Sequence, residues 1–182
     1  MYYKYIILFA IAFITILLQL KNYYNSYLYK YFRNEDDIIY DYLITFINCV
    51  SKDNYYMNYG LWDNVNNTLE NANINLCSFI FSNANLNVTD TFNILDVGCG
   101  YGKQDFLLHG MVSSSSKIIG LDLSKKQIVF ANKCRKKNKI DKKQLTFVAG
   151  DAHYITDKFN RKFNRKFNRI FSIESAFHYK DR

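Results

Sequence analysis

The stretch Ile94-Leu-Asp-Val-Gly-Cys-Gly-Tyr-Gly102 joins a short apolar run to a loop in which every second residue is glycine. Three of the seven glycines in this 182-residue chain lie here, at positions 98, 100 and 102. Glycine is favoured where the backbone takes a positive φ or where a ligand comes very close to it. The pattern therefore predicts a strand that turns through a tight loop into a helix, whose first N–H groups face a bound small molecule.

The spacing of these glycines differs from that of dinucleotide-binding loops, which follow the pattern G-x-G-x-x-G. Here the pattern is G-x-G-x-G, and Asp96 places a carboxylate at the end of the preceding strand. A negative charge beside the loop disfavours a pyrophosphate and favours a ligand that carries positive charge. We therefore expect the loop to bind a cationic small molecule.

Three further apolar runs also end in acidic residues. They are Lys117–Leu121 with Asp122, Leu145–Ala149 with Asp151, and Arg169–Ile173 with Glu174. Ser124 to Gln127 fits a capping box that begins a helix between the second and third runs. Alternating strands and helices predict an α/β fold with a parallel sheet. The acids would then lie at the carboxyl ends of the strands, the edge where such sheets bind ligands.

Together, the loop and the acids resemble the class I S-adenosylmethionine (SAM)-dependent methyltransferases over about residues 55 to 182. The resemblance implies a Rossmann-like sheet with strand order 3-2-1-4, lacking the later strands of the seven that the family has. It implies SAM as cofactor, with Asp96–Gly102 around the methionine end, Asp122 on the ribose and Asp151 beside the adenine. The cofactor-binding residues expected from it are Tyr59, Asp96, Gly98, Cys99, Gly100, Gly102, Asp122, Leu123, Gln127, Asp151 and Ala152.

Two segments resemble the family's small-molecule and lipid-modifying members, such as sterol and tocopherol-precursor methyltransferases. They are Asn58-Tyr-Gly-Leu-Trp62 and Glu174-Ser-Ala-Phe-His178-Tyr-Lys-Asp-Arg182. The resemblance implies methyl transfer to a small-molecule or lipid acceptor. His178 is the expected general base, since its ordinary pKa lies near neutrality, and Glu174 is expected to orient it or to stabilise a cationic intermediate. A packing role for His178 is the alternative.

Other features bear on the choice of acceptor. His109 and His153 lack a comparable placement. Nucleic-acid amino-methyltransferases of this fold carry an N/D-P-P-aromatic motif after the fourth strand, but this chain has no proline. A nucleic-acid substrate is therefore not expected, although the net charge is +8. We interpret the lysines after the second strand as a solvated helix face.

The N-terminal segment from Tyr5 to Leu20 is apolar except for Thr15 and Gln19. As a helix it would span about 24 Å at ~1.5 Å per residue, and flanking tyrosines could extend it toward the ~30 Å hydrocarbon core. Basic residues beyond it favour a catalytic domain in the cytoplasm. We expect a single-pass membrane anchor within residues 1–22, with a cleaved signal peptide or a buried helix as alternatives.

Between this segment and the sheet, residues 23–90 are expected to form a helical cap or linker, and 91–182 the incomplete SAM-binding domain. Apolar spacing predicts helices over 36–50 and 63–82, the second lined by Val65, Leu69, Ala72, Leu76, Phe79 and Ile80. Four scattered cysteines form no zinc or disulfide pattern, which fits a reducing compartment. The repeat Lys-Phe-Asn-Arg, from 158, 162 and 166, is interpreted as an inert insertion or as a binder of RNA or anionic lipid.

The missing strands leave two hypotheses for the whole. The chain is part of an active methyltransferase, or it is a truncated, catalytically inactive fragment that still binds SAM at a membrane. The oligomeric state does not follow from the sequence.

Overall fold

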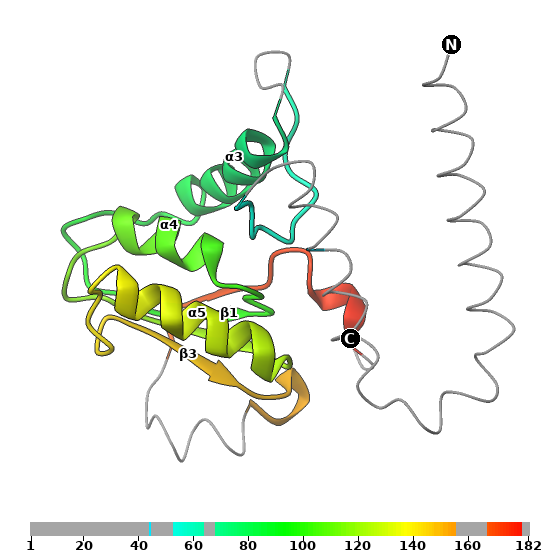
Figure 1. Cartoon of the computed structure of the whole chain (residues 1–182). Coiled ribbons are helices and arrows are strands. Elements are labelled where there is room, and N and C mark those ends of the chain that lie inside the picture. Colours follow the sequence, from blue (N-terminus) through cyan, green and yellow to red (C-terminus); the bar gives the residue numbers. More distant parts are fainter. Residues whose placement is uncertain (1–43, 45–52, 64–67, 156–166, 180–182) are drawn as a thin grey trace, which may run out of the picture. The chain divides into compact units, whose positions relative to one another are not determined.

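The computed structural model of the chain describes residue 44 and residues 53–63, 68–155 and 167–179. These residues belong to the compact unit Asp41–Arg182, and the other unit, Met1–Tyr40, lies outside them. The described part is an α/β arrangement in which helices alternate with parallel strands (Figure 1).

Four strands of the described part form one parallel sheet in the order β3-β2-β1-β4. Their bounds are Asn93–Val97 for β1, Lys117–Asp122 for β2, Leu145–Ala149 for β3 and Arg169–Phe171 for β4. The predicted strand order is confirmed. Strand β4 is two residues shorter than the predicted run, because Ser172 and Ile173 already belong to the turn that follows it.

Three helices pack on one face of the sheet: α3 (Leu69–Ser82), α4 (Lys103–Met111) and α5 (Lys125–Lys137) (Figure 1). Side chains alternate between the two faces of a strand, so every second strand residue points toward these helices. The shared core contains Cys77 and Phe81 of α3, Leu108 of α4, Ile128 and Ala131 of α5, and Ile94, Ile118, Leu145, Phe147 and Phe171 of the strands.

The intervening strand residues form a second apolar cluster on the opposite face. Its buried members are Leu95, Val97, Ile119 and Leu121. Burial on both faces explains why the strand runs are apolar throughout instead of alternating with polar residues. The Rossmann-like architecture expected from the sequence is therefore present in the described part.

Helix α3 begins later than predicted, but most of its predicted apolar face is buried: Ala72 is 0% exposed, and Leu76 and Ile80 pack against the core. Thr68 caps it by accepting a hydrogen bond from the N–H of Asn71 at 3.2 Å. The prediction that Phe79 lines the buried face is wrong, because its side chain is 59% exposed. Asn73 is buried as well: its side chain accepts a hydrogen bond from that of Asn54 at 2.9 Å and donates one to that of Asn58 at 3.0 Å. A buried polar contact therefore lies beside the apolar face of this helix.

Several predictions fall on residues that the structure does not describe. The anchor within 1–22, all of the helix over 36–50 except the buried Ile44, and the first two copies of the repeat, 158–165, lie outside the described residues. None of the helices in the described ranges is long and apolar enough to cross a bilayer. In the last copy of the repeat, Asn168 joins the sheet by exchanging hydrogen bonds with the backbone of Asn93, each at 3.0 Å.

Candidate cofactor site at the glycine loop

The glycine loop runs from the end of β1 to the start of α4 and needs glycine for two separate reasons. Gly98 and Gly102 have φ angles of +82° and +76°, in the left-handed region that side chains disfavour. A Cβ on Gly98 would also lie 2.3 Å from Cβ of Ser175, and one on Gly102 would lie 2.5 Å from the ring of Phe147. The loop therefore lies flat against its neighbours, with its backbone close to the carboxyl edge of the sheet.

Asp122, at the end of β2, ties this loop to the next helix. Its Oδ2 accepts the N–H of Gly100 at 2.8 Å, and its Oδ1 accepts the N–H of Ser124 at 2.9 Å. Each carboxylate oxygen can accept more than one hydrogen bond, so one carboxylate can hold backbone N–H groups and ligand hydroxyl groups together. The structure thus brings Asp122 and the loop together, as the sequence predicted from strand ends alone.

Half of the predicted capping box is present after Asp122, because the N–H of Ser124 donates to Asp122 and not to the side chain of Gln127. Ser124 Oγ accepts the N–H of Gln127 at 3.4 Å and begins α5. Gln127 is buried, and its Oε1 lies 3.8 Å from the position that a Cβ on Gly100 would occupy. The side chain of Leu123 is 63% exposed at the strand end. An exposed apolar side chain next to the hydrogen-bonded Asp122 could pack against the flat ring of a nucleotide base. Leu123 therefore remains a predicted cofactor contact.

Asp96 is buried, and it belongs to a polar cluster beneath the glycine loop. Gln104 Nε2 donates to its Oδ2 at 2.6 Å. Asp105, in the first turn of α4, is fully buried, and the charge of Asp96 acts on it. Burial raises the pKa of Asp96 to about 7, although the hydrogen bond from Gln104 opposes this rise. The sequence analysis did not anticipate Gln104 or Asp105.

Asp151 and Ala152 follow β3 at the same edge. Asp151 Oδ1 accepts both the backbone N–H of His153, at 2.9 Å, and its Nδ1, at 2.7 Å. The ring of His153 also makes an edge-to-face contact with Tyr179, with centroids 6.3 Å apart. His153, left without a role in the sequence analysis, is thus oriented by an acid that the resemblance places beside the adenine.

The loop after β4 is fastened to the end of β1. Ser175 Oγ donates to the carbonyl oxygen of Val97 at 2.6 Å, and the hydroxyl of Tyr179 donates to the same oxygen at 3.2 Å. His178 lies between them in the short helix η2 (Ala176–His178), exposed and with its ring 4.2 Å from that of Phe177. The predicted base therefore belongs to a segment that packs directly on Gly98.

Residues 53–63 cover the glycine loop. The ring of Tyr55 lies 5.6 Å from that of Tyr101, and Met57 Cγ would lie 3.3 Å from a Cβ on Gly100. Glu174 Oε2 accepts the backbone N–H of Tyr59 at 2.7 Å, while the Tyr59 ring is 72% exposed. Glu174 and Tyr59, predicted for catalysis and for cofactor binding, are thus joined to each other across the site.

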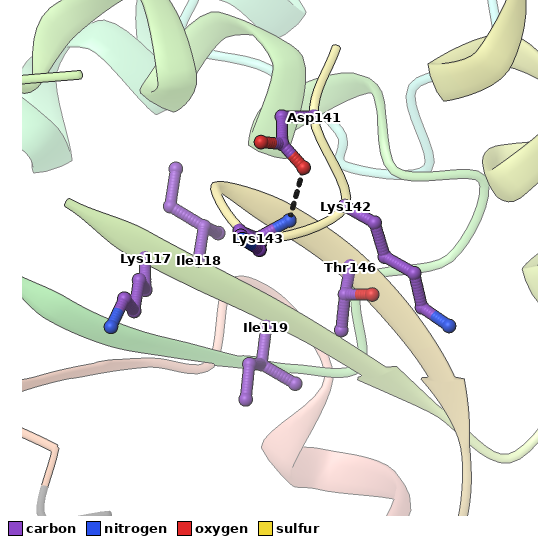
Figure 2. A pocket seen from close by; sticks show the side chains of 7 residues that line it. All are labelled: Lys117, Ile118, Ile119, Asp141, Lys142, Lys143 and Thr146. Carbon is purple, nitrogen blue, oxygen red and sulfur yellow. Dashed lines mark hydrogen bonds between the residues drawn. The ribbon is translucent and has the colours of Figure 1, made fainter. Parts of the chain in front are cut away.

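A hollow of about 420 Å³ lies elsewhere, and Figure 2 shows its seven lining residues. Lys117 and Thr146 lie near the amino ends of β2 and β3, the end of the sheet opposite the glycine loop. In Figure 2 the side chains of Lys117 and Lys142 point away from each other, so they do not converge on one anion. We place the candidate site at the glycine loop and not in this hollow.

The parallel sheet, its glycine loop and the acids at the strand ends define a Rossmann-like ligand-binding domain. Residues 88–181, just over half of the chain, match the model of the methyltransferase domain family. The chain belongs to this family.

Solved structures share the fold at low sequence identity. The cyclase SpnF is 22% identical with a TM-score of 0.53, and covers 63% of this chain and 40% of its own. Coclaurine N-methyltransferase, bound to N-methylheliamine and SAH, is 17% identical with a TM-score of 0.57, covering 71% of this chain and 35% of its own. The mycolic acid cyclopropane synthase CmaA1, complexed with SAH and CTAB, is 22% identical with a TM-score of 0.51, covering 67% and 38%.

The chain thus spans about two fifths or less of each of these structures. No sequence of a curated protein matches it.

Proposed function

We propose that the chain binds SAM at the glycine loop and takes part in transferring its methyl group to a small-molecule or lipid acceptor. The observation that carries this proposal is Asp122, whose carboxylate holds the N–H of Gly100 on one side and that of Ser124 on the other. This places an acid whose oxygens can each accept more than one hydrogen bond beside a backbone that a ligand can approach closely. The family match supports the type of chemistry.

The residues present fit SAM, which when bound supplies a methyl group on a positively charged sulfur. Asp96 and Asp122 are the acids nearest the loop, and their charge complements a cation. Asp122 would accept the ribose hydroxyls, and Asp151, Ala152 and Leu123 would hold the base. The loop fixes the donor, and alignment of donor and acceptor supplies much of the rate in such transfers.

The first prediction concerns binding of SAM, measured by calorimetry with the full chain. Asp122→Ala should weaken binding at least about tenfold, because it removes the acceptor for two backbone N–H groups and for the ligand. Asp141→Ala is the matched control: this acid also caps a backbone N–H, that of Lys143 at 2.9 Å, but at the opposite end of the sheet. Absence of SAM binding by the unaltered chain, or equal loss in both variants, would overturn the proposal.

The second prediction concerns turnover, measured as transfer of a labelled methyl group from SAM to a lipid extract. A lipid acceptor is favoured by the predicted N-terminal anchor. His178→Ala should lower transfer about 100-fold with SAM binding unchanged, since an oxygen acceptor needs a base. His109→Ala, a histidine on α4 within 3.4 Å of Gln144 Oε1, should leave transfer unchanged. Full transfer by the His178 variant would show that another group acts as the general base, and His153 would then be tested first.

The alternative function is binding of SAM without turnover. It predicts normal SAM binding and no labelled product with any acceptor. Methyl transfer by the 182-residue chain alone would exclude it.

A further inference from the structure

Two carboxyl groups are buried together between β1 and α4. Asp105 is 0% exposed and Asp96 is 2% exposed, and the charge of Asp96 acts on Asp105. The backbone N–H of Asp105 donates to the carbonyl oxygen of Gly102 at 3.1 Å. Among the described residues, no N–H or hydroxyl group donates to either carboxyl oxygen of Asp105, nor to Oδ1 of Asp96.

A proton shared by the two groups would give these oxygens a partner. Two carboxylates only accept hydrogen bonds, so a bond between them needs a proton on one of them. Burying a carboxylate that has no donor costs far more free energy than burying the neutral acid. Gln104 Nε2 already donates to Asp96, whereas Asp105 has no such donor. The proton therefore lies on Asp105, and Asp96 is the member of the pair that ionises.

The groups around the pair reinforce this assignment. Asp122 faces it from β2, and the buried thiols of Cys77 and Cys99 face it from α3 and the loop. Burial, followed by the charge of Asp96, raises the pKa of Asp105 well above its usual range. Burial also raises the pKa of both thiols, that of Cys77 to about 12, so they stay neutral. Glu174 acts in the same direction on Cys77.

We propose that Asp105 is a positioning residue: as a neutral acid it donates a hydrogen bond to the Asp96 carboxylate and fixes the orientation and charge of Asp96 toward the cationic methionine end of SAM. The proposal rests on the proposed function for its ligand. The proton on Asp105 itself is tested without SAM.

The first measurement is the thermal unfolding midpoint between pH 5 and pH 9 without ligand. The folded chain keeps a proton on Asp105 that the unfolded chain releases above about pH 4, so this residue makes the fold less stable as pH rises. Asp105→Asn cannot titrate and should remove that part of the slope. Its midpoint relative to the unaltered chain should therefore rise from pH 5 to pH 9. Parallel curves would overturn the assignment of the proton.

The second measurement is the affinity for SAM across the same pH range. Asp105→Asn keeps a donor to Asp96 and should bind within about threefold of the unaltered chain. Asp105→Leu, of similar shape but without a donor, should bind at least about tenfold more weakly at pH 7. Its binding should also recover toward higher pH, because the pKa of Asp96 rises when the hydrogen bond that lowers it is lost.

The outcomes separate the two proposals. If the unaltered chain binds no SAM at any pH, the proposed function fails, while the unfolding curves still decide where the proton is. If it binds SAM and the Leu and Asn variants bind alike with the same pH profile, the positioning role of Asp105 fails. If the Leu variant does not fold, Asp105→Ala takes its place, with circular dichroism as the check on folding and the same expected loss.

Discussion

Gly98 shows how one missing side chain lets two loops meet. It has a φ of +82°, and Ser175 of the loop after β4 fills the space where its Cβ would be. The hydroxyl of Ser175 then reaches the carbonyl of Val97 at 2.6 Å. A single position thus combines a backbone conformation that other residues disfavour with a contact that no other residue permits.

Gly98→Ala should therefore destabilise the chain by roughly 2–4 kcal/mol, combining left-handed strain with overpacking. The matched control is Gly110→Ala in α4, where an added Cβ would meet nothing within 4 Å. That change should stabilise the chain by about 0.5–1 kcal/mol, the usual gain over glycine inside a helix. Unfolding in urea measures both changes, and equal effects would contradict the steric argument.

At the scale of elements, the segment 53–63 is held on the sheet by side chains from opposite parts of the chain. Asn54 and Asn58 bond to Asn73 of α3, and the backbone of Tyr59 bonds to Glu174 after β4. Glu174 has a φ of +49°, an uncommon conformation for a residue with a side chain. Strain of this kind persists where surrounding contacts fix the residue, and such positions cluster at ligand sites. We infer that the side chain of Glu174 holds the segment 53–63 over the glycine loop.

Hydrogen exchange at the amide of Tyr59 tests whether Glu174 holds this segment. Glu174→Ala should speed exchange about tenfold, as expected for loss of a partly exposed hydrogen bond to a charged group. Glu174→Gln keeps an acceptor and should have a smaller effect. The amide of Gly100, held by Asp122, serves as the internal control and should not change. Unaltered exchange at Tyr59 in the Ala variant would show that Glu174 does not hold the segment.

The elements also show what the sequence predicts well. Strand order was predictable from the family resemblance, and the meeting of Asp122 with the glycine loop was predictable because parallel strands bring all their carboxyl ends to one edge. The burial of Asn73 was not, because apolar spacing cannot reveal that Asn73 has two amide partners in a distant segment. The bond between Tyr59 and Glu174 joins residues 115 positions apart and leaves no local pattern.

Asp105 is the clearest case of a site residue that sequence patterns hide. An acid in the first turn of a helix is ordinarily a solvent-exposed partner of the helix dipole. Here the same position points into the protein and meets Asp96. Only the packing of α4 on β1 turns an ordinary capping preference into a buried pair of acids.

At the scale of the whole molecule, the described part is organised around one edge of one sheet. The glycine loop, Asp122, Asp151 and the loop after β4 all lie at the carboxyl ends of the strands. The helices behind them supply buried support: α4 brings Gln104 and Asp105, and α5 brings Gln127. Buried side chains therefore support the acids at the glycine loop, whereas His178, the predicted base, is exposed.

The contact between Gly98 and Ser175 limits which residues evolution can accept at these two positions. Because the φ of +82° at Gly98 disfavours any side chain and a Cβ there would lie 2.3 Å from that of Ser175, we expect position 98 to keep glycine. We expect position 175 to keep a small residue, since it packs directly on Gly98. The residue types at these two positions, which lie 77 residues apart, thus reflect a contact that forms only in the folded protein.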